Sequence, residues 1–195
     1  MDKHLNVIIK ISILSAIAFL LMVLIEIPLP IFPDFLKLDV SDLPAIFGSF
    51  AIGPAAGVVI EAVKNILHAI LKPATAGIGE TANFVVGAVY VYTAGLIYLL
   101  KKNRKHALLG LVAGTIAMSA VAAIGNYYVF LPLYESILKF PISAAVSMAS
   151  KINPAIKDIN SLVILSIVPF NLLKGIIVST VAFLFYKKLS PILHK

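Results

Sequence analysis

Residues 5–27, with the sequence LNVIIKISILSAIAFLLMVLIEI, decide which class of protein this chain belongs to. A helix needs about 20 mainly apolar residues to cross the ~30 Å hydrocarbon core of a bilayer, and this stretch is long enough. Pro28, Pro30 and Pro33 follow it, and proline does not continue a helix. No small-x-small cleavage motif follows its apolar part, so a signal peptide is a poor fit. The stretch therefore predicts a first transmembrane helix.

The whole chain has the composition of a protein that is solvated largely by lipid. Of its 195 residues, 61% are apolar and 13% are charged, whereas soluble domains are about half apolar and a quarter charged. We therefore expect an all-α membrane protein that forms a single transmembrane domain over residues 1–195. The six expected spans are residues 5–27, 43–52, 54–71, 81–100, 106–131 and 159–186.

The second expected span is too short to cross a bilayer. Residues 43–52 end at Gly53-Pro54, and a helix of about ten residues is only ~15 Å long. We expect a short or tilted helix that its neighbours shield from lipid. The chain shows no convincing internal repeat, which argues against a secondary transporter built from inverted repeats.

The distribution of Lys and Arg predicts that both chain ends lie in the cytoplasm. The net charge is +7, but the basic residues lack the interleaved aromatics of a strand-binding groove, so no nucleic-acid partner is expected. The inner segments would carry Lys3, Lys10, Lys101, Lys102, Arg104, Lys105, Lys187, Lys188 and Lys195, and the outer loops only Lys37, Lys72, Lys139, Lys151 and Lys157.

The third expected span carries four polar side chains on one face. Glu61, Lys64, Asn65 and His68 lie at offsets 0, 3, 4 and 7, within about 100° of one another. Each ion near the bilayer centre costs roughly 2.5 to 3.5 kcal/mol, so this face does not point at lipid. One interpretation is a structural Glu61–Lys64 pair that holds the bundle together. The other is the polar wall of a ligand pocket, since four residues exceed what one pair requires.

The fifth and sixth expected spans also carry polar residues. Asn171 and Lys174 lie three residues apart on one face of the sixth span, with no acid nearby in the sequence. Lys174 therefore needs a partner, either Glu61 across the bundle or a ligand. Asn126, near the outer end of the fifth span, is equally suited to an interhelical hydrogen bond and to a ligand contact.

The expected outer loop before the second span alternates apolar and polar residues over 35–44. By itself this pattern is typical of a segment that caps a helix, with Ser41 or Asp42 as the N-cap. The chain has no cysteine. Since it also lacks a phosphate-binding loop, a zinc motif and a nucleophile elbow, we expect neither a cofactor nor an enzyme.

Four blocks of the chain contain most of these polar residues. They are LKLDVSDLPA from Leu36, FAIGPAAG from Phe50 with EAVKNILH from Glu61, NYYVFLPLY from Asn126, and PFNLLKG from Pro169. In this order they resemble the blocks of the riboflavin-binding S-components of energy-coupling factor (ECF) transporters, and together they extend over most of the chain.

The resemblance implies a six-helix S-component that binds riboflavin from outside and associates with a transmembrane coupling protein and two cytoplasmic ATPases. Such a protein lies in a prokaryotic cell membrane, and FMN is a further candidate ligand because Lys174 supplies a cation. The long connection from Leu133 to Asp158 predicts an extra outer lid. Alternatives are an S-component for another vitamin, a small proton-coupled carrier with a Glu61, Lys64 and His68 relay, and a membrane enzyme or assembly factor.

The resemblance also implies a role for individual residues. Asn126, Asn171 and Lys174 would bind the polar edge of the isoalloxazine ring or the ribityl chain. The ring would be covered by a loop that consists of Leu38, Asp39, Val40, Ser41 and Asp42. The pocket would be lined or braced by Glu61, Lys64 and Asn65. The coupling protein would contact Ser12 and Ala16.

Overall fold

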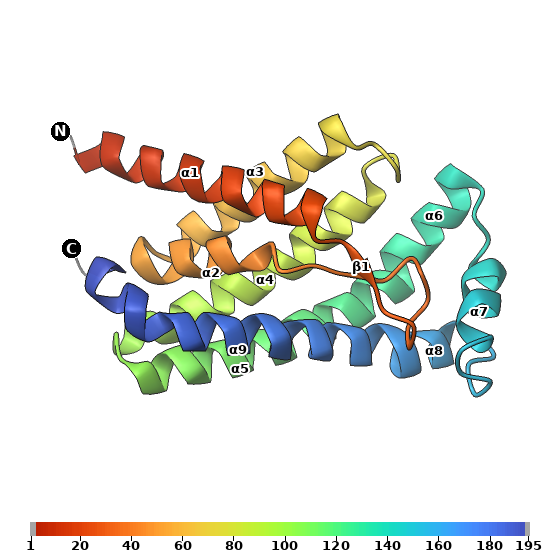
Figure 1. The fold of residues 1–195 in the computed structure, drawn as a ribbon. Helices are drawn as coiled ribbons and strands as arrows, with labels where there is room; N and C mark the ends of the chain where they lie inside the picture. The colour runs from red at the N-terminus through yellow and green to blue at the C-terminus, as the bar shows by residue number, and fades with distance from the viewer. Residues whose placement is uncertain (1–2, 194–195) are drawn as a thin grey trace.

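The long apolar stretches of the sequence fold as helices that lie side by side in a bundle (Figure 1). The computed structural model describes the backbone of residues 3–193 and the side chains of residues 4–186. The side chains of Lys3, Lys187, Lys188 and Lys195, used above to predict orientation, lie outside the described residues. The elements are α1 (Lys3–Leu24), β1 (Ile27–Pro28), β2 (Lys37–Leu38), α2 (Asp42–Ala51), α3 (Pro54–Leu71), α4 (Ile78–Leu100), α5 (Arg104–Gly125), the π-helical turn η1 (Asn126–Phe130), α6 (Leu131–Leu138), α7 (Ile142–Ser150), α8 (Ile159–Leu162), the π-helical turn η2 (Val163–Ile167) and α9 (Val168–Leu193).

Five helical segments of the described chain are long and apolar enough to cross a membrane. They are His4–Leu24, Pro54–Leu71, Ile78–Leu100, Arg104–Leu138 and Ile159–Tyr186. The sixth expected span forms α2, which has ten residues and is thus about 15 Å long. The described residues therefore contain five candidate spans, and the sixth expected span is the short helix α2.

The short helix α2 is enclosed by the bundle, as the sequence predicted. Ala45 and Ile46 are fully buried, and Phe50 is nearly so. A Cβ atom on Gly57 of α3 would lie 2.9 Å from the Ala45 carbonyl oxygen, so only glycine lets α2 and α3 approach this closely. Neighbouring helices thus surround α2 in place of lipid, since α2 is too short to span a bilayer.

The first helix ends earlier than expected, at Leu24 rather than Ile27. Because Pro28 disfavours the helical conformation in the residue before it, the chain becomes extended there. Ile27 pairs with Leu38 and Pro28 with Lys37 in a two-stranded antiparallel hairpin. The expected outer loop is therefore tied back to the end of α1.

The fifth and sixth spans each contain a π-helical turn, η1 and η2, that ends two residues before a proline. Pro132 follows η1 and Pro169 follows η2. A proline inside a helix clashes with the carbonyl four residues earlier and offers it no N–H, and a wider turn accommodates this defect. Both turns lie at the level of the polar residues Asn126 and Asn171.

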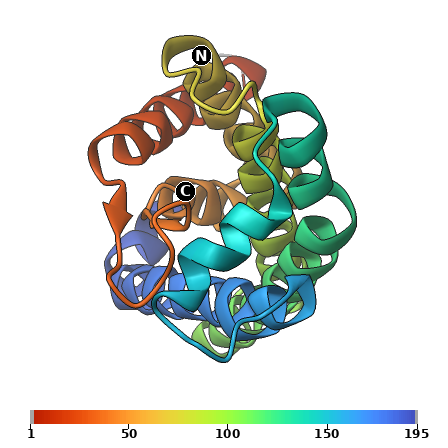
Figure 2. The same cartoon turned by 90° about the vertical axis from the view of Figure 1, so that its right-hand side faces the viewer.

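The connection from Leu133 to Asp158, which was expected to form an extra outer lid, is partly helical. The helix continues through α6 to Leu138 and stops at Lys139, whose φ is 55°. The chain then forms α7, which crosses the end of the bundle in front of the long helices (Figure 2). This end also carries the β1–β2 hairpin, whereas α1 begins and α9 ends at the opposite end (Figure 1).

Candidate functional site

A cavity of about 480 Å³ lies at the end of the bundle that the hairpin and α7 cover. Its volume falls in the ~300–1,000 Å³ range of small-molecule sites. Every long helix of the bundle contributes to its wall. The apolar residues of the wall include Met22, Phe35, Leu36, Ala74, Ala82, Val86, Ala122, Leu131, Leu138, Phe140, Ala145 and Phe170, and the polar ones Glu26, Lys37, Asp39, Asp42, His68, Lys72, Thr75, Glu80, Asn83, Asn126, Tyr134, Asn171 and Lys174.

The three phenylalanines of the wall come from separate parts of the chain. Phe35 belongs to the hairpin loop, Phe140 to the α6–α7 connection and Phe170 to α9. Phe32 of the same hairpin loop packs edge-on against Phe170, with ring centroids 5.3 Å apart. The hairpin is therefore fixed to the bundle by apolar contacts as well as by its polar ones.

A buried cluster of five charged residues lies beside the cavity. Lys174 Nζ donates to Asp39 Oδ2 at 2.9 Å and lies 3.2 Å from Asp42 Oδ2. Lys64 Nζ donates to Asp42, to Glu61 Oε1 at 3.0 Å and to Ser41 Oγ at 2.8 Å. We refer to Asp39, Asp42, Glu61, Lys64 and Lys174 as the central cluster.

The central cluster joins three elements that are far apart in the sequence. Asp39 precedes α2 and Asp42 begins it, Glu61 and Lys64 belong to α3, and Lys174 belongs to α9. Ser41 reinforces this segment, because both its backbone N–H and its hydroxyl donate to Asp39 Oδ1. Buried charges are tolerated only when they are paired, so these contacts hold the segment against the two helices.

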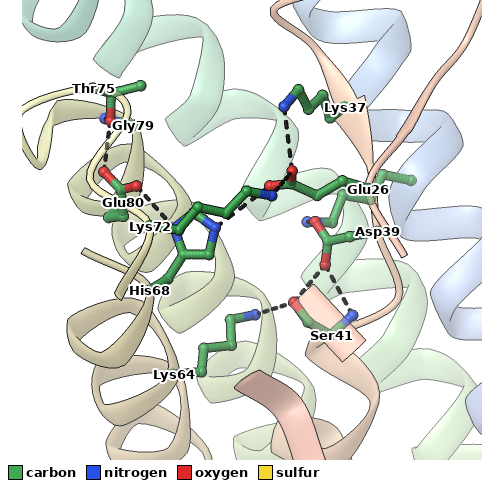
Figure 3. A network of polar contacts seen from close by, with 11 residues as sticks. Glu26, Lys37, Asp39, Ser41, Lys64, His68, Lys72, Thr75, Gly79 and Glu80 are labelled. Atoms are coloured by element: carbon green, nitrogen blue, oxygen red, sulfur yellow. Dashed lines mark hydrogen bonds and ion pairs between the residues drawn. The ribbon is translucent and has the colours of Figure 1, made fainter. Parts of the chain in front are cut away.

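A second polar network surrounds His68 at the wall of the cavity (Figure 3). His68 Nδ1 lies 2.9 Å from Glu80 Oε1, and its Nε2 lies 3.5 Å from Glu26 Oε1. Thr75 Oγ1 donates to Glu80 Oε2 at 2.6 Å. The network thus connects the chain just after α1 with the end of α3 and the start of α4.

Glu26 is the point at which two lysines meet this network. Lys72 Nζ donates to Glu26 Oε2 at 2.6 Å and Lys37 Nζ at 3.2 Å. Burial by itself would raise the pKa of Glu26, but the two lysines outweigh it, so the pKa lies below its ordinary value of 4.5. Glu26 is therefore ionised at neutral pH and holds β2 to the end of α3.

Asn126 and Asn171 are held in place at the cavity wall by their own helices. Each side-chain amide donates to the carbonyl oxygen four residues earlier, Asn126 to Ala122 and Asn171 to Ile167, both at 2.8 Å. A carboxamide has two N–H donors and one carbonyl acceptor. Each residue therefore keeps a donor and an acceptor for a ligand.

The structure brings together most of the site residues expected from the sequence, but it divides them into two groups. Leu38 and Val40 do not line the cavity, and Ser41 is buried beneath it. Asp39, Asp42, Asn126, Asn171 and Lys174 line the cavity, whereas Glu61, Lys64 and Asn65 do not. Lys64 contacts the wall residue Asp42, and Asn65 donates to the Glu61 carbonyl of its own helix.

Two expectations about polar contacts are corrected. Lys174 pairs with Asp39 and Asp42, not with Glu61. Ser41 occupies the N-cap position of α2, but its side chain makes no capping bond and instead binds Asp39 and Lys64. The segment 39–42 therefore supplies counter-ions to the helices, because buried lysines need carboxylates more than α2 needs a cap.

Several residues of the cavity were missed from the sequence, most clearly Glu26, Lys72, Glu80 and Asn83. Lys72 had a usable signal, since it extends the polar stripe of α3 by four residues beyond His68. Glu26 follows the end of α1 and has no periodicity to identify it. The combination of apolar and aromatic walls with amides and charges can bind a largely apolar molecule that has a polar edge.

Comparisons with known proteins agree with this architecture. The chain is 38% identical over 187 residues to the riboflavin transporter RibU of Staphylococcus aureus (strain TCH60), covering 96% of this chain and 92% of that one. It is 36% identical over 185 residues to the riboflavin transporter FmnP of Bacillus subtilis (strain 168), covering 93% and 90%.

A solved structure of the S component of a bacterial ECF transporter is similar to this one. The two superpose with a TM-score of 0.77 at 36% sequence identity, and the match covers 99% of this chain and all of the other. The family model for the substrate-specific component of ECF transporters matches residues 6–186. This chain therefore belongs to the family of substrate-specific components of ECF transporters.

Proposed function

We propose that this chain captures riboflavin for an ATP-dependent ECF transporter and holds it in the cavity at the covered end of the bundle. The observation that carries the proposal is the cavity itself, in which Asn126, Asn171 and Lys174 converge between aromatic walls. Two relatives that are similar over nearly their full length are riboflavin transporters. The family is a family of transporter components, so the chain is not an enzyme.

The chemistry of riboflavin suits this cavity. Its ring is flat and largely apolar, which matches Phe35, Phe140 and Phe170. The polar edge of the ring offers donors and acceptors to the amides of Asn126 and Asn171. Lys174 is already held by Asp39 and Asp42. It therefore keeps the segment 39–42 against the ligand, and its third N–H can donate to the ligand.

The proposed topology is that of an S-component with six helical segments, α2 being the short one, and with both ends inside. The start of α1, the end of α9 and the α4–α5 connection lie at one end of the bundle in Figure 1. That connection carries Lys101, Lys102, Arg104 and Lys105, the strongest inside signal. The cavity lies at the other end and would open outward from a multi-pass protein of a prokaryotic cell membrane.

The proposed partners are a transmembrane coupling protein and two cytoplasmic ATPases. Ser12 and Ala16 are both exposed on α1, and small residues let another helix approach closely. The relay of a proton-coupled carrier is not supported, because Glu61 and Lys64 belong to the central cluster whereas His68 contacts Glu26 and Glu80.

A flavin titration tests the proposal directly. Purified protein should quench the fluorescence of riboflavin and show flavin absorbance bands at a ratio near one to one. FMN serves as the second ligand. It should bind more weakly because the lysines of the wall are already paired with acids, Lys174 with Asp39 and Asp42, and Lys37 and Lys72 with Glu26. If native protein binds no flavin, the assignment of riboflavin is wrong.

A further inference from the structure

A second hollow, of about 230 Å³, lies between α3 and α4 on the lateral surface of the bundle. Both helices are candidate membrane spans, and Ile66 at the rim of the hollow is 58% exposed, so this surface faces lipid. We refer to the hollow as the α3–α4 groove. Its wall includes the apolar residues Ala62, Ile66, Ala69 and Phe84 and the polar residues Asn65 and Thr81.

Asn65 carries an unpaired hydrogen-bond acceptor at this groove. The residue is only 3% exposed, and its side-chain N–H donates to the Glu61 carbonyl at 2.9 Å. Its Oδ1 atom has no hydrogen-bond partner among the described residues. Buried polar atoms are paired in the great majority of cases, and the bilayer core holds no water that could donate instead. The missing donor is therefore expected from a molecule that enters the groove.

The groove is polar near the ends of the two helices and apolar farther from them. Because α3 ends at Leu71 and α4 begins at Ile78, Thr81 lies near the mouth of the groove. Ala62 lies about 14 Å from the end of α3, and Phe84 lies farther along α4 than Thr81. This order matches a lipid whose head group lies at the mouth and whose acyl chain runs toward the bilayer centre.

We propose that the α3–α4 groove binds a membrane lipid with an uncharged, hydroxylated head group, for example a galactosyl diacylglycerol. A head-group hydroxyl donates to Asn65 Oδ1, and an acyl chain packs against Ala62 and Phe84. Glu80 also lines the groove, and its carboxylate disfavours an anionic head group. An ammonium head group would lose more hydration in a largely apolar groove than a hydroxyl does.

The test uses fluorescence quenching by lipid. The chain contains no tryptophan, so one introduced tryptophan reports lipid contact at a single position. Ile66→Trp places it at the rim of the groove. Ile70→Trp, one turn along α3, is the matched control, because Ile70 is 68% exposed and does not line the groove.

Each variant is reconstituted in phosphatidylcholine vesicles with a rising fraction of galactosyl diacylglycerol that carries brominated acyl chains, which quench tryptophan on contact. Half-maximal quenching at position 66 should need a fraction of this lipid about five times lower than at position 70, as expected for one hydrogen bond. Brominated phosphatidylcholine, whose head group has no donor, should quench the two positions at similar fractions.

Two further variants in the Ile66→Trp background locate the recognition. Asn65→Leu, of similar size, removes the acceptor and should raise the half-maximal fraction to that of position 70. Ala69→Leu fills the groove and leaves Asn65 in place, and it should have the same effect. Thermal unfolding in detergent checks that both variants are folded.

Three results would overturn the inference. The first is a half-maximal fraction that is equal at positions 66 and 70. The second is a low fraction at position 66 that persists in either folded variant, Asn65→Leu or Ala69→Leu. The third is equally tight quenching by brominated phosphatidylglycerol or phosphatidylethanolamine, which would reject an uncharged head group. The vesicles contain no flavin, so none of these results bears on the proposed function.

Discussion

Lys174 Nζ and Asp39 Oδ2 lie 2.9 Å apart although 135 positions separate the two residues in the sequence. This pair fixes the segment before α2 to α9 at the wall of the cavity. Only 6% of Lys174 and 5% of Asp39 are exposed. The pair is thus both a structural link and part of the candidate binding site.

Removing one partner of this pair should destabilise the protein strongly. Lys174→Met leaves Asp39 buried without its cation, and breaking a buried pair in this way costs about 3–5 kcal/mol. The double variant Lys174→Met with Asp39→Asn should recover part of that loss, because no unpaired charge remains. Unfolding in detergent would measure the coupling, and strictly additive losses would contradict it.

The acids of the central cluster should differ in importance. Asp42 contacts both lysines, whereas Glu61 contacts only Lys64. Neutralising either acid leaves one carboxylate for each lysine, but the loss of Asp42 weakens the pairing of both lysines, whereas the loss of Glu61 weakens that of Lys64 alone. We expect Asp42→Asn to cost about 3–5 kcal/mol and Glu61→Gln no more than about 1–2 kcal/mol in the same unfolding assay. A larger loss for Glu61→Gln would disprove this ranking.

Gly87 should not tolerate a larger residue. A Cβ atom there would lie 2.5 Å from Glu61 Oε2, and overpacking of a buried site costs about 1–3 kcal/mol. Gly87→Ala should therefore lower the stability by this amount. In the background of Glu61→Ala, which removes the clashing carboxylate, the added cost of Gly87→Ala should largely disappear. An unchanged cost in that background would place the clash elsewhere.

The contacts of Glu26 predict a pH dependence of stability. Its pKa is lowered in the folded protein from an ordinary value of 4.5, so the folded state favours the ionised form. The stabilisation is therefore fully present above pH 4.5 and is lost as the pH falls through the lower folded pKa. The melting temperature of Glu26→Gln should lie below that of the wild type at pH 7, and the two should converge in acid. A constant difference at every pH would count against the ion pairs.

The amides of the cavity should contribute equally to the binding of riboflavin and of lumiflavin, in which a methyl group replaces the ribityl chain. Asn126→Leu and Asn171→Leu each remove a donor and an acceptor from the cavity wall. We expect each to weaken riboflavin and lumiflavin to a similar extent, about three- to tenfold. Wild-type affinity in both variants would exclude these residues from the ligand site. Fluorescence quenching of the two flavins measures all four affinities.

The positions of the helices could be predicted from the sequence because the relevant signal is local. The third span was expected over residues 54–71 and is observed as Pro54–Leu71. The predicted bounds are wrong at those helix ends where tertiary contacts compete with helix formation. The helix of residues 5–27 stops at Leu24 to form the hairpin, and the fifth span continues to Leu138 because α6 packs at the end of the bundle.

By itself, the sequence determined that this is a helical membrane protein and which of its side chains are too polar to face lipid. The length of the apolar stretches predicts the membrane helices, and the 3.6-residue period of a helix predicts which polar side chains share a face. Both signals depend only on residues that are neighbours along one helix. The tertiary structure decided which charges meet. Asp39 became the partner of Lys174, and Glu26 that of Lys72, because a buried charge is paired with whichever opposite charge the packing brings near, however distant in sequence.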